Sequence, residues 1–268
     1  MLDHLAPARR RVVLGSIGLL AVAVLAVALV VAVPRVVGSG SQTDPVPQDA
    51  QPPVLLVPGY GGGTAGLGVL AAALHRAGRA VPIVRLAGDG TGDLNVQAGL
   101  VQDAVRRAVA GGADSVDLVG YSAGGVTVRL WAKQYDGGSV ARRIVTLGSP
   151  HHGTDLASLG ADLAPDSCPV ACLQLATDSD LIRGLDNGDE TPAGPAWVSI
   201  WTADDQISTP PETAVLAGAL DFSVQQVCPD VRVSHGQLPE SPVVIAMVED
   251  QLRRTPPTLP DAEVCVSR

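Results

Sequence analysis

The chain has 268 residues, of which 46% are hydrophobic and 17% are charged, a balance that excludes general disorder and allows one large hydrophobic core. Its formal net charge is -9, and aromatic residues make up only 3% of the chain. An acidic body repels phosphate backbones, and few rings are present to stack on bases, so we expect no nucleic-acid partner.

The N-terminal part is predicted to direct the protein to or across a membrane. Residues 12–33 contain no charged side chain and are about as long as the ~20-residue helix that spans a bilayer core. Arginines precede this run, which favours a cytoplasmic N-terminus and export of the rest of the chain. Residues 1–35 are therefore predicted to be either an uncleaved transmembrane anchor or a cleaved signal, which leaves the protein membrane-anchored or secreted. Residues 36–53, rich in Gly, Ser and Pro, are predicted to be a flexible linker, and residues 54–268 one folded domain.

From residue 54 the chain alternates short apolar runs with longer amphipathic ones. Strands are predicted at 54–57, 81–86, 116–120, 143–149, 197–201 and 224–233. Helices are predicted at 66–77, 94–110, 123–134, 171–186 and 242–254. This alternation predicts an α/β fold with a mostly parallel sheet and helices on both faces. In such sheets ligands bind beyond the carboxyl ends of the strands.

A short motif comes after the predicted strand 116–120. The residues GYSAG at 120–124 match the G-x-S-x-G pattern, and a predicted helix comes directly after them. In this strand-turn-helix context a sharp turn exposes the hydroxyl of the serine. Side chains at Gly120 and Gly124 would collide with the neighbouring strand and helix. Ser122 is therefore the candidate nucleophile.

Three runs of sequence carry a family resemblance. They are VLLVPGYGGG at 54–63, VDLVGYSAGGV at 116–126 and LGSPHHGT at 147–154. With the C-terminal runs described below, they make the chain resemble the bacterial class 2 lipase/esterase group of the α/β-hydrolases. The resemblance implies an α/β-hydrolase fold, a serine nucleophile and the cleavage of carboxylic esters.

The resemblance also implies where an oxyanion would be held. One donor in this fold is the backbone N–H after the nucleophile, here that of Ala123. The other comes from the loop after an early strand, which by resemblance is the N–H of Tyr60. The chain departs from the group at Pro58 and Tyr121, where histidine is common. Neither position carries chemistry in the fold, so we expect neither departure to affect catalysis.

The candidate general base is His235, which lies in the run VRVSHGQL shortly before the last predicted helix. The triad of this fold follows the order Ser, then Asp or Glu, then His, and His235 fits that order. The family places its catalytic histidine in a similar S-H-G run. The neighbouring His151 and His152 would have to precede the acid, so they are predicted to shape the rim of the pocket.

The candidate acid comes after the predicted strand 197–201. Two adjacent carboxylates, Asp204 and Asp205, compete for this role in the loop. In the family the catalytic aspartate stands two residues before an Ile or Val, which here corresponds to Ile207 and implies Asp205. The resemblance thus leaves Asp204 as a residue of the rim.

Four cysteines lie beyond the predicted export segment, an even number that in an oxidising compartment indicates two disulfides. Sequence allows three pairings, and we favour Cys168–Cys172 and Cys228–Cys265. A zinc site is the alternative, but the cysteines form no paired C-x2-C units, and we expect no metal.

The sequence as a whole predicts a serine hydrolase that cleaves carboxylic esters or acylglycerols through an acyl-enzyme. An envelope acyltransferase using the same Ser122, Asp205 and His235 is the alternative. The only roomy segment is 151–195, and much of it is predicted to be one helix of the ordinary fold, so we expect a minimal lid or none. We further expect no cofactor, an ester or lipid substrate, contact with the membrane through the N-terminal segment, and a monomeric enzyme.

Overall fold

A computed structural model describes residues 46–253 and 255–266. The predicted anchor or signal segment 1–35 lies outside the described residues, as does most of the predicted linker. Within the described ranges, none of the helices combines the length with the apolar character that a bilayer crossing requires.

The described chain is built on five parallel strands that succeed one another across the sheet in the order of the sequence. They are β1 (Val54–Val57), β2 (Val116–Tyr121), β3 (Ala141–Leu147), β4 (Ala196–Trp201) and β5 (Leu220–Ser223). The parallel sheet confirms the predicted α/β class. All strand ends of one polarity meet at one edge of such a sheet, so the loops that leave the strands are brought together there.

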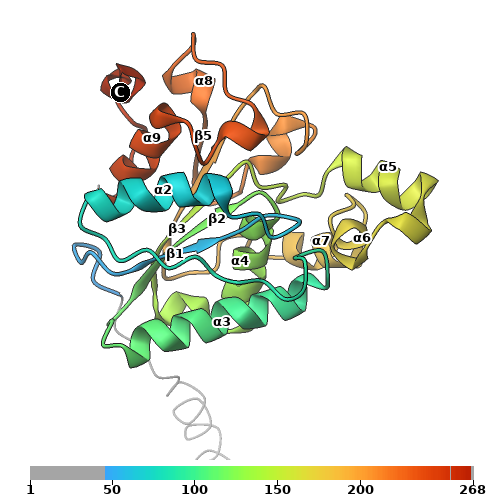
Figure 1. The fold of residues 1–268 in the computed structure, drawn as a ribbon, viewed down its shortest axis with the longest axis horizontal. Coiled ribbons are helices and arrows are strands. Elements are labelled where there is room, and N and C mark those ends of the chain that lie inside the picture. The colour runs from blue at the N-terminus through green and yellow to red at the C-terminus, as the bar shows by residue number, and fades with distance from the viewer. Residues whose placement is uncertain (1–45, 254, 267–268) are drawn as a thin grey trace, which may run out of the picture. The chain divides into compact units, whose positions relative to one another are not determined.

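Two layers of helices cover the two faces of the sheet (Figure 1). The long helices are α2 (Ala65–Arg76), α3 (Leu94–Ala110), α4 (Ala123–Gln134) and α9 (Pro242–Arg253). Alternate residues of β1 divide between the two cores because successive side chains of a strand point to opposite faces. Leu55 and Val57 pack in the core under α3 and α4, whereas Val54 and Leu56 pack in the core under α2 and α9.

Short elements complete the described chain. The short α-helices are α5 (Asp155–Leu163), α6 (Val170–Gln174), α7 (Asp180–Asp186) and α8 (Val224–Val227). The 3-10 turns are η1 (Gly137–Ser139), η2 (Pro165–Ser167), η3 (Pro211–Ala214), η4 (His235–Gln237) and η5 (Ala262–Val266). Figure 1 shows α5, α6 and α7 gathered at one end of the sheet, between β3 and β4 in the chain.

Two predicted strands were wrong. Residues 81–86 contribute only a single bridge, between Ile83 and Leu56. Pro82 has no N–H to donate to a ladder, which limits pairing there. In the segment predicted at 224–233, residues 224–227 form the helix α8 instead, because the side chain of Ser223 accepts from the N–H of Gln226 and caps its first turn. Residues 228–233 form no strand. The last strand is the preceding segment, β5.

The single helix predicted at 171–186 is also wrong, since this segment divides into α6 and α7. Ser179 marks the break: its side chain accepts from the N–H of Ile182 at the start of α7 and donates to the carbonyl of Gln174 at the end of α6. Because one hydroxyl bonds both to the last carbonyl of α6 and to an N–H in the first turn of α7, it favours the start of a new helix over continuation of the first one.

Disulfides join Cys168 to Cys172 and Cys228 to Cys265, the pairing favoured from the sequence. The first joins Cys168, directly after η2, to Cys172 within α6. The second ties the segment after α8 to η5, near the C-terminal end of the described chain.

Candidate active site

Ser122 occupies the sharp turn between β2 and α4. Its backbone has φ 54° and ψ -129°, a conformation that residues other than glycine adopt only at a cost of about 1–3 kcal/mol. The N–H of Ser122 donates to the carbonyl of Leu147, which fixes the turn against the end of β3. Backbone strain of this kind is kept where the surrounding structure enforces it, and such places are commonly functional.

The two glycines that flank the motif are required by close packing. A Cβ on Gly120 would lie 2.5 Å from Cα of Gly125, and a Cβ on Gly124 would lie 2.3 Å from the carbonyl oxygen of Val57. Both distances are far below van der Waals contact. A side chain at Gly120 would collide with α4, the helix that begins after the serine, and a side chain at Gly124 would collide with the end of β1.

His235 brings Ser122 and Asp205 into one hydrogen-bonded chain. Its Nε2 lies 2.9 Å from Oγ of Ser122, and its Nδ1 lies 2.7 Å from Oδ2 of Asp205. The side chains come from three separate places: the turn after β2, the loop after β4 and the 3-10 turn η4. His235 is 7% exposed and Asp205 is 6% exposed, so water competes little for these hydrogen bonds.

The carboxylate of Asp205 is itself held in place. Its Oδ1 accepts from the backbone N–H groups of Ile207 (2.8 Å) and Ser208 (2.9 Å), which leaves Oδ2 for the imidazole. Asp204 is engaged elsewhere, because its Oδ2 accepts from the side-chain amide of Gln225 at 3.2 Å. Of the two carboxylates that the sequence offered, Asp205 is the one in contact with His235.

A cavity of about 230 Å³ opens beside Ser122. Tyr60 and Ala123, the predicted oxyanion donors, both line it. Ala123 is the first residue of α4, and the first N–H groups of a helix have no acceptor within that helix. The N–H of Tyr60 donates to no acceptor in the described part of the chain. Both groups are therefore available to a bound oxygen.

Most of the remaining wall of this cavity is apolar. The aliphatic and proline side chains are those of Pro150, Leu156, Ala157, Leu175 and Ile207. Cys172, one half of the shorter disulfide, is also part of the wall. An elongated apolar group can be buried here next to the hydroxyl of Ser122, where it gains the hydrophobic free energy of leaving water.

His151 and His152 do not line the Ser122 cavity, so their predicted place at its rim is wrong. His151 is completely buried, and its Nε2 lies 3.0 Å from the hydroxyl of Thr146. His152 turns away, with Nδ1 3.1 Å from Oδ2 of Asp186. The neighbouring Pro150 and Thr154 reach the cavity instead.

Tyr121 takes part in the site, a role that sequence reasoning missed. Its hydroxyl donates to the backbone carbonyl of His235 at 3.2 Å, and the centres of the two rings lie 5.3 Å apart. Burial, together with the carboxylates of Asp205 and Glu240, raises the pKa of Tyr121 to about 12. The hydroxyl therefore remains a donor across the neutral range. Only the sequence position directly before Ser122 hinted at this role.

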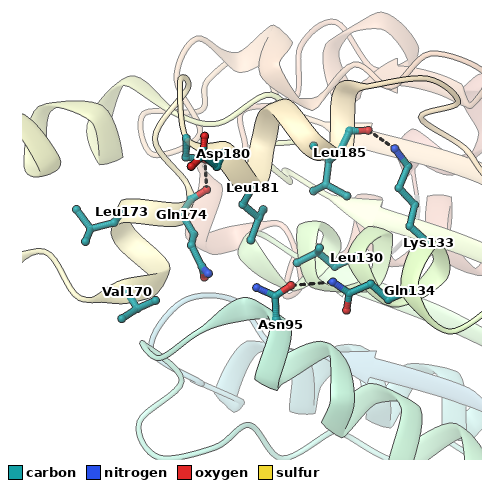
Figure 2. Close-up of a pocket in the computed structure, with 12 residues that line it drawn as sticks. Asn95, Leu130, Lys133, Gln134, Val170, Leu173, Gln174, Asp180, Leu181 and Leu185 are labelled. Carbon is teal, nitrogen blue, oxygen red and sulfur yellow. Dashed lines mark hydrogen bonds between the residues drawn. The ribbon is translucent and has the colours of Figure 1, made fainter.

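A larger hollow, of about 710 Å³, lies between α3, α4, α6 and α7 (Figure 2). None of the predicted site residues lines it. Several of its polar groups are already paired: the amide of Gln134 donates to Oδ1 of Asn95 at 2.7 Å, and Nζ of Lys133 donates to the carbonyl of Leu185. Volume alone therefore does not mark the functional site of this protein.

Comparison with known proteins establishes the fold. No family model matches the chain, and no curated protein matches it. Among solved structures, lipase B of Aspergillus fumigatus superposes on 81% of this chain with a TM-score of 0.71 and 21% identity. The chain spans 57% of that lipase.

Two bacterial structures show the same likeness. The mature form of Bacillus licheniformis lipase BlEst2 covers 67% of this chain, with a TM-score of 0.55 and 20% identity, and 86% of its own length is matched. The product of the lin2722 gene of Listeria innocua covers 80% of the chain, with a TM-score of 0.56 and 16% identity, and 97% of its length is matched. The chain therefore has the α/β-hydrolase fold that the resemblance implied.

Proposed function

We propose that this protein is a serine hydrolase that cleaves carboxylic esters, with Ser122 as nucleophile, His235 as general base and Asp205 as its partner. The observation that carries the proposal is the continuous hydrogen-bonded chain from Oγ of Ser122 through His235 to Asp205. Nucleophile, base and orienting acid within hydrogen-bond distance form the arrangement that activates a serine hydroxyl. The lipases of the same fold support the proposal.

The proposed reaction has two steps. His235 accepts the proton of Ser122 as Oγ attacks the ester carbonyl, and Asp205 stabilises the imidazolium without taking a proton itself. The N–H groups of Tyr60 and Ala123 donate to the oxyanion, an interaction whose loss typically costs about 3–4 kcal/mol of barrier. The alcohol leaves with the proton from His235. A water molecule, deprotonated by His235, then attacks the acyl carbon. The bond from that carbon to Oγ breaks, the acid is released, and His235 returns the proton to Oγ of Ser122.

The shape of the Ser122 cavity supports an ester with an apolar acyl group. The aliphatic wall accommodates a hydrocarbon chain, and a volume of about 230 Å³ suits short or medium lengths. Large exposed apolar side chains surround the cavity: Tyr60 (45%), Leu156 (50%) and Ile207 (46%) both line it and face solvent. Lipid substrates are therefore part of the proposed range.

We also propose that the protein acts outside the cytoplasm, with the region 54–268 as its catalytic domain. The two disulfides support this location, since such bonds persist in oxidising compartments. The apolar run at 12–33 supports it independently through its length and its preceding arginines.

The test is Ser122→Ala in the full-length chain, compared with Ser139→Ala, which removes an exposed hydroxyl far from the motif. We expect the first variant to lose p-nitrophenyl butyrate hydrolysis by about 10⁴-fold or more while keeping the same circular dichroism, and the second to remain active. Labelling by a fluorophosphonate should likewise disappear only in the first. Hydrolysis retained by Ser122→Ala would refute the proposal. Formation of a new ester when an alcohol acceptor is added would favour the acyltransferase instead.

A further inference from the structure

Three side chains of the kinds that bind metal ions converge outside the Ser122 cavity: His152, Asp186 and Glu190. They come from separate segments, namely the loop after β3, the last residue of α7 and the connection from α7 to β4. Each offers one ligand nitrogen or oxygen, and these three atoms all lie within 4.8 Å of one another. We call this group the His152 cluster.

The contacts of His152 determine which of its ring nitrogens carries a proton. Nε2 lies 3.0 Å from the backbone carbonyl of Val215, which can only accept, so Nε2 is protonated. In the neutral ring Nδ1 is then an acceptor with a free lone pair. Nδ1 nevertheless faces a second acceptor, Oδ2 of Asp186, at 3.1 Å. Two lone pairs at this distance repel, so the contact requires a positive species between them, which is either a second proton or a metal ion.

The distance between Nδ1 and Oδ2 suits two ligands of one metal ion. Zinc binds histidine nitrogen and carboxylate oxygen at about 2.0–2.2 Å, and two such bonds that meet at about 90–110° place their ligand atoms about 2.8–3.5 Å apart. The observed 3.1 Å lies within this range. A proton would join His152 to Asp186 alone, whereas the convergence of Glu190 on the same point supplies a third ligand for an ion.

Further hydrogen bonds hold the ligands as metal sites require. A histidine that binds a metal through one nitrogen donates its other N–H to a carbonyl or carboxylate, as Nε2 does to Val215. Oδ1 of Asp186 accepts from the buried guanidinium of Arg129 at 3.0 Å, which turns Oδ2 toward the imidazole. Oε2 of Glu190 accepts from the N–H of Ala217 at 2.8 Å, which fixes that side chain as well.

Arg129 also fixes the backbone that carries the ligands. Its guanidinium donates to the carbonyls of His151, Leu185 and Glu190. Two of these carbonyls come directly before a residue of the cluster in the chain, and the third belongs to the cluster itself. The three ligands are therefore held in position by one buried side chain, which lowers the entropic cost of binding an ion.

The charges of the His152 cluster favour a cation. Asp186 and Glu190 contribute two negative charges, and Arg129 contributes one positive charge. Lys133 interacts with both carboxylates and with Asp189, so this outer pair adds no net charge. With a neutral imidazole the cluster keeps one negative charge, which attracts a divalent cation.

We propose that the His152 cluster binds a divalent transition-metal cation, for which Zn²⁺ is the best match. Imidazole nitrogen suits zinc, whereas Ca²⁺ and Mg²⁺ take oxygen ligands. The side chains of His152 and Asp186 are 36% and 30% exposed, so an ion with three protein ligands can complete its coordination with water. The expectation of no metal came from the cysteines, none of which belongs to this cluster.

The role of this ion is structural. The three ligands lie outside the Ser122 cavity, and the ion joins the loop after β3 to α7 and to the segment before β4. Those segments are far apart in the sequence, so a shared ion stabilises the folded chain, in which alone the ligands converge.

The experiment measures zinc binding to the full-length protein after treatment with a chelator, by isothermal titration calorimetry. We expect Zn²⁺ to bind at the His152 cluster and Ca²⁺ to bind there at least about tenfold more weakly. At a zinc concentration about a hundredfold above Kd, the Tm should rise by about 5–10 °C. Neither measurement uses an ester, so the result is independent of the proposed hydrolase function.

Two conservative substitutions locate the site. His152→Gln and Glu190→Gln should each weaken zinc binding by about 100-fold or more, because even the loss of a residue that only supports a ligand costs about 10–100-fold. The controls are His75→Gln, at an exposed position, and Glu263→Gln, in a group of carboxylates that contains no histidine. Both should bind zinc as the unmodified protein does. Circular dichroism verifies that all four variants fold.

Two results would overturn the proposal. One is zinc binding that is as tight in His152→Gln and Glu190→Gln as in the controls. The other is the absence of zinc binding together with nitrogen-15 NMR signals that show both ring nitrogens of His152 protonated, since a proton would then occupy the position between Nδ1 and Oδ2. Either result would leave the proposed hydrolase function standing.

Discussion

The hydroxyl of Tyr121 donates a hydrogen bond to the backbone carbonyl of His235, 3.2 Å away, and thereby joins the residue before the candidate nucleophile to the candidate base. The tyrosine ring also lies against the imidazole, with ring centres 5.3 Å apart. Because β2 is paired on both sides within the sheet and η4 is a short turn, this contact ties the turn that carries the base to the sheet that carries the nucleophile. Tyr121 is therefore a positioning residue for His235.

Tyr121→Phe tests this role, since it keeps the ring and removes only the hydroxyl. A lost neutral hydrogen bond is worth about 1 kcal/mol, so we expect kcat for p-nitrophenyl butyrate to fall about fivefold with little change in KM. The matched control is Tyr135→Phe, because Tyr135 is 38% exposed and does not line the Ser122 cavity. Equal kcat values in the two variants would contradict the positioning role.

Substitution of the two adjacent aspartates should separate their roles. Asp205→Asn keeps the shape of the side chain but removes the charge beside Nδ1 of His235, so we expect kcat to fall by about 10⁴-fold. Asp204→Asn should cost at most about tenfold, because Asp204 contacts Gln225 and not the imidazole. Steady-state kinetics on one ester measures both. A larger loss in Asp204→Asn than in Asp205→Asn would reverse the assignment of the acid.

The two disulfides are expected to have different consequences when removed. Cys228 and Cys265 are 37 positions apart and Cys168 and Cys172 only 4 apart. A longer closed loop restricts the unfolded chain more. Loss of the Cys228–Cys265 disulfide should therefore lower the free energy of unfolding by about 4 kcal/mol, and loss of the Cys168–Cys172 disulfide by about 2 kcal/mol. Denaturant unfolding of the paired Cys→Ser variants measures both values.

The two disulfides should rank in the opposite order in their effect on activity. Cys172 lines the Ser122 cavity, so removal of its disulfide is expected to raise KM for a butyrate ester severalfold. The Cys228–Cys265 pair lies outside that cavity, and its loss should leave KM unchanged at temperatures where the variant stays folded. If the shorter disulfide contributed more to stability and the longer one more to KM, the placement of both roles would be wrong.

The burial of His151 leads us to expect that the folded protein loses stability as the pH falls. Its complete burial, reinforced by the charge of Arg129, holds the pKa of His151 well below the ordinary value of 6.5. Below pH 6.5 the unfolded chain binds a proton at this residue that the folded chain does not, so the free energy of unfolding falls as the pH falls. For one group the slope is at most about 1.4 kcal/mol per pH unit.

His151→Gln should remove this contribution, since glutamine does not titrate. At pH 7 the variant is expected to be less stable than the unmodified protein, and between pH 6.5 and 5 the difference should narrow by up to about 2 kcal/mol. Denaturant unfolding at several pH values measures the change. The control is His75→Gln, at an exposed position, and its free energy of unfolding should change with pH in the same way as that of the unmodified protein. If the difference in the free energy of unfolding between His151→Gln and the unmodified protein stayed constant across this pH range, the proposed effect of the burial of His151 would be wrong.

The sequence by itself determined the parts of this protein that depend on local pattern. Alternating apolar and amphipathic runs predicted the parallel sheet and the four long helices α2, α3, α4 and α9, and α3 and α4 begin and end at the predicted residues. The same holds for the turn at Ser122, because a strand, a turn flanked by glycines and a helix are adjacent in the chain. The physical cause there, a collision of any Cβ at Gly120 or Gly124, acts over short distances at the turn itself.

Only the tertiary structure decided the features that depend on contacts between distant segments. Asp204 and Asp205 are neighbours with the same chemistry, so only the resemblance favoured Asp205, and the contacts that distinguish them are tertiary. Asp205 faces His235, 30 positions later, and Asp204 faces Gln225. The contact of Tyr121 with His235 spans 114 positions, and it forms only because the fold brings η4 against the end of β2. Side-chain partners of this kind are set by how packed elements bring loops together, which local propensity does not encode.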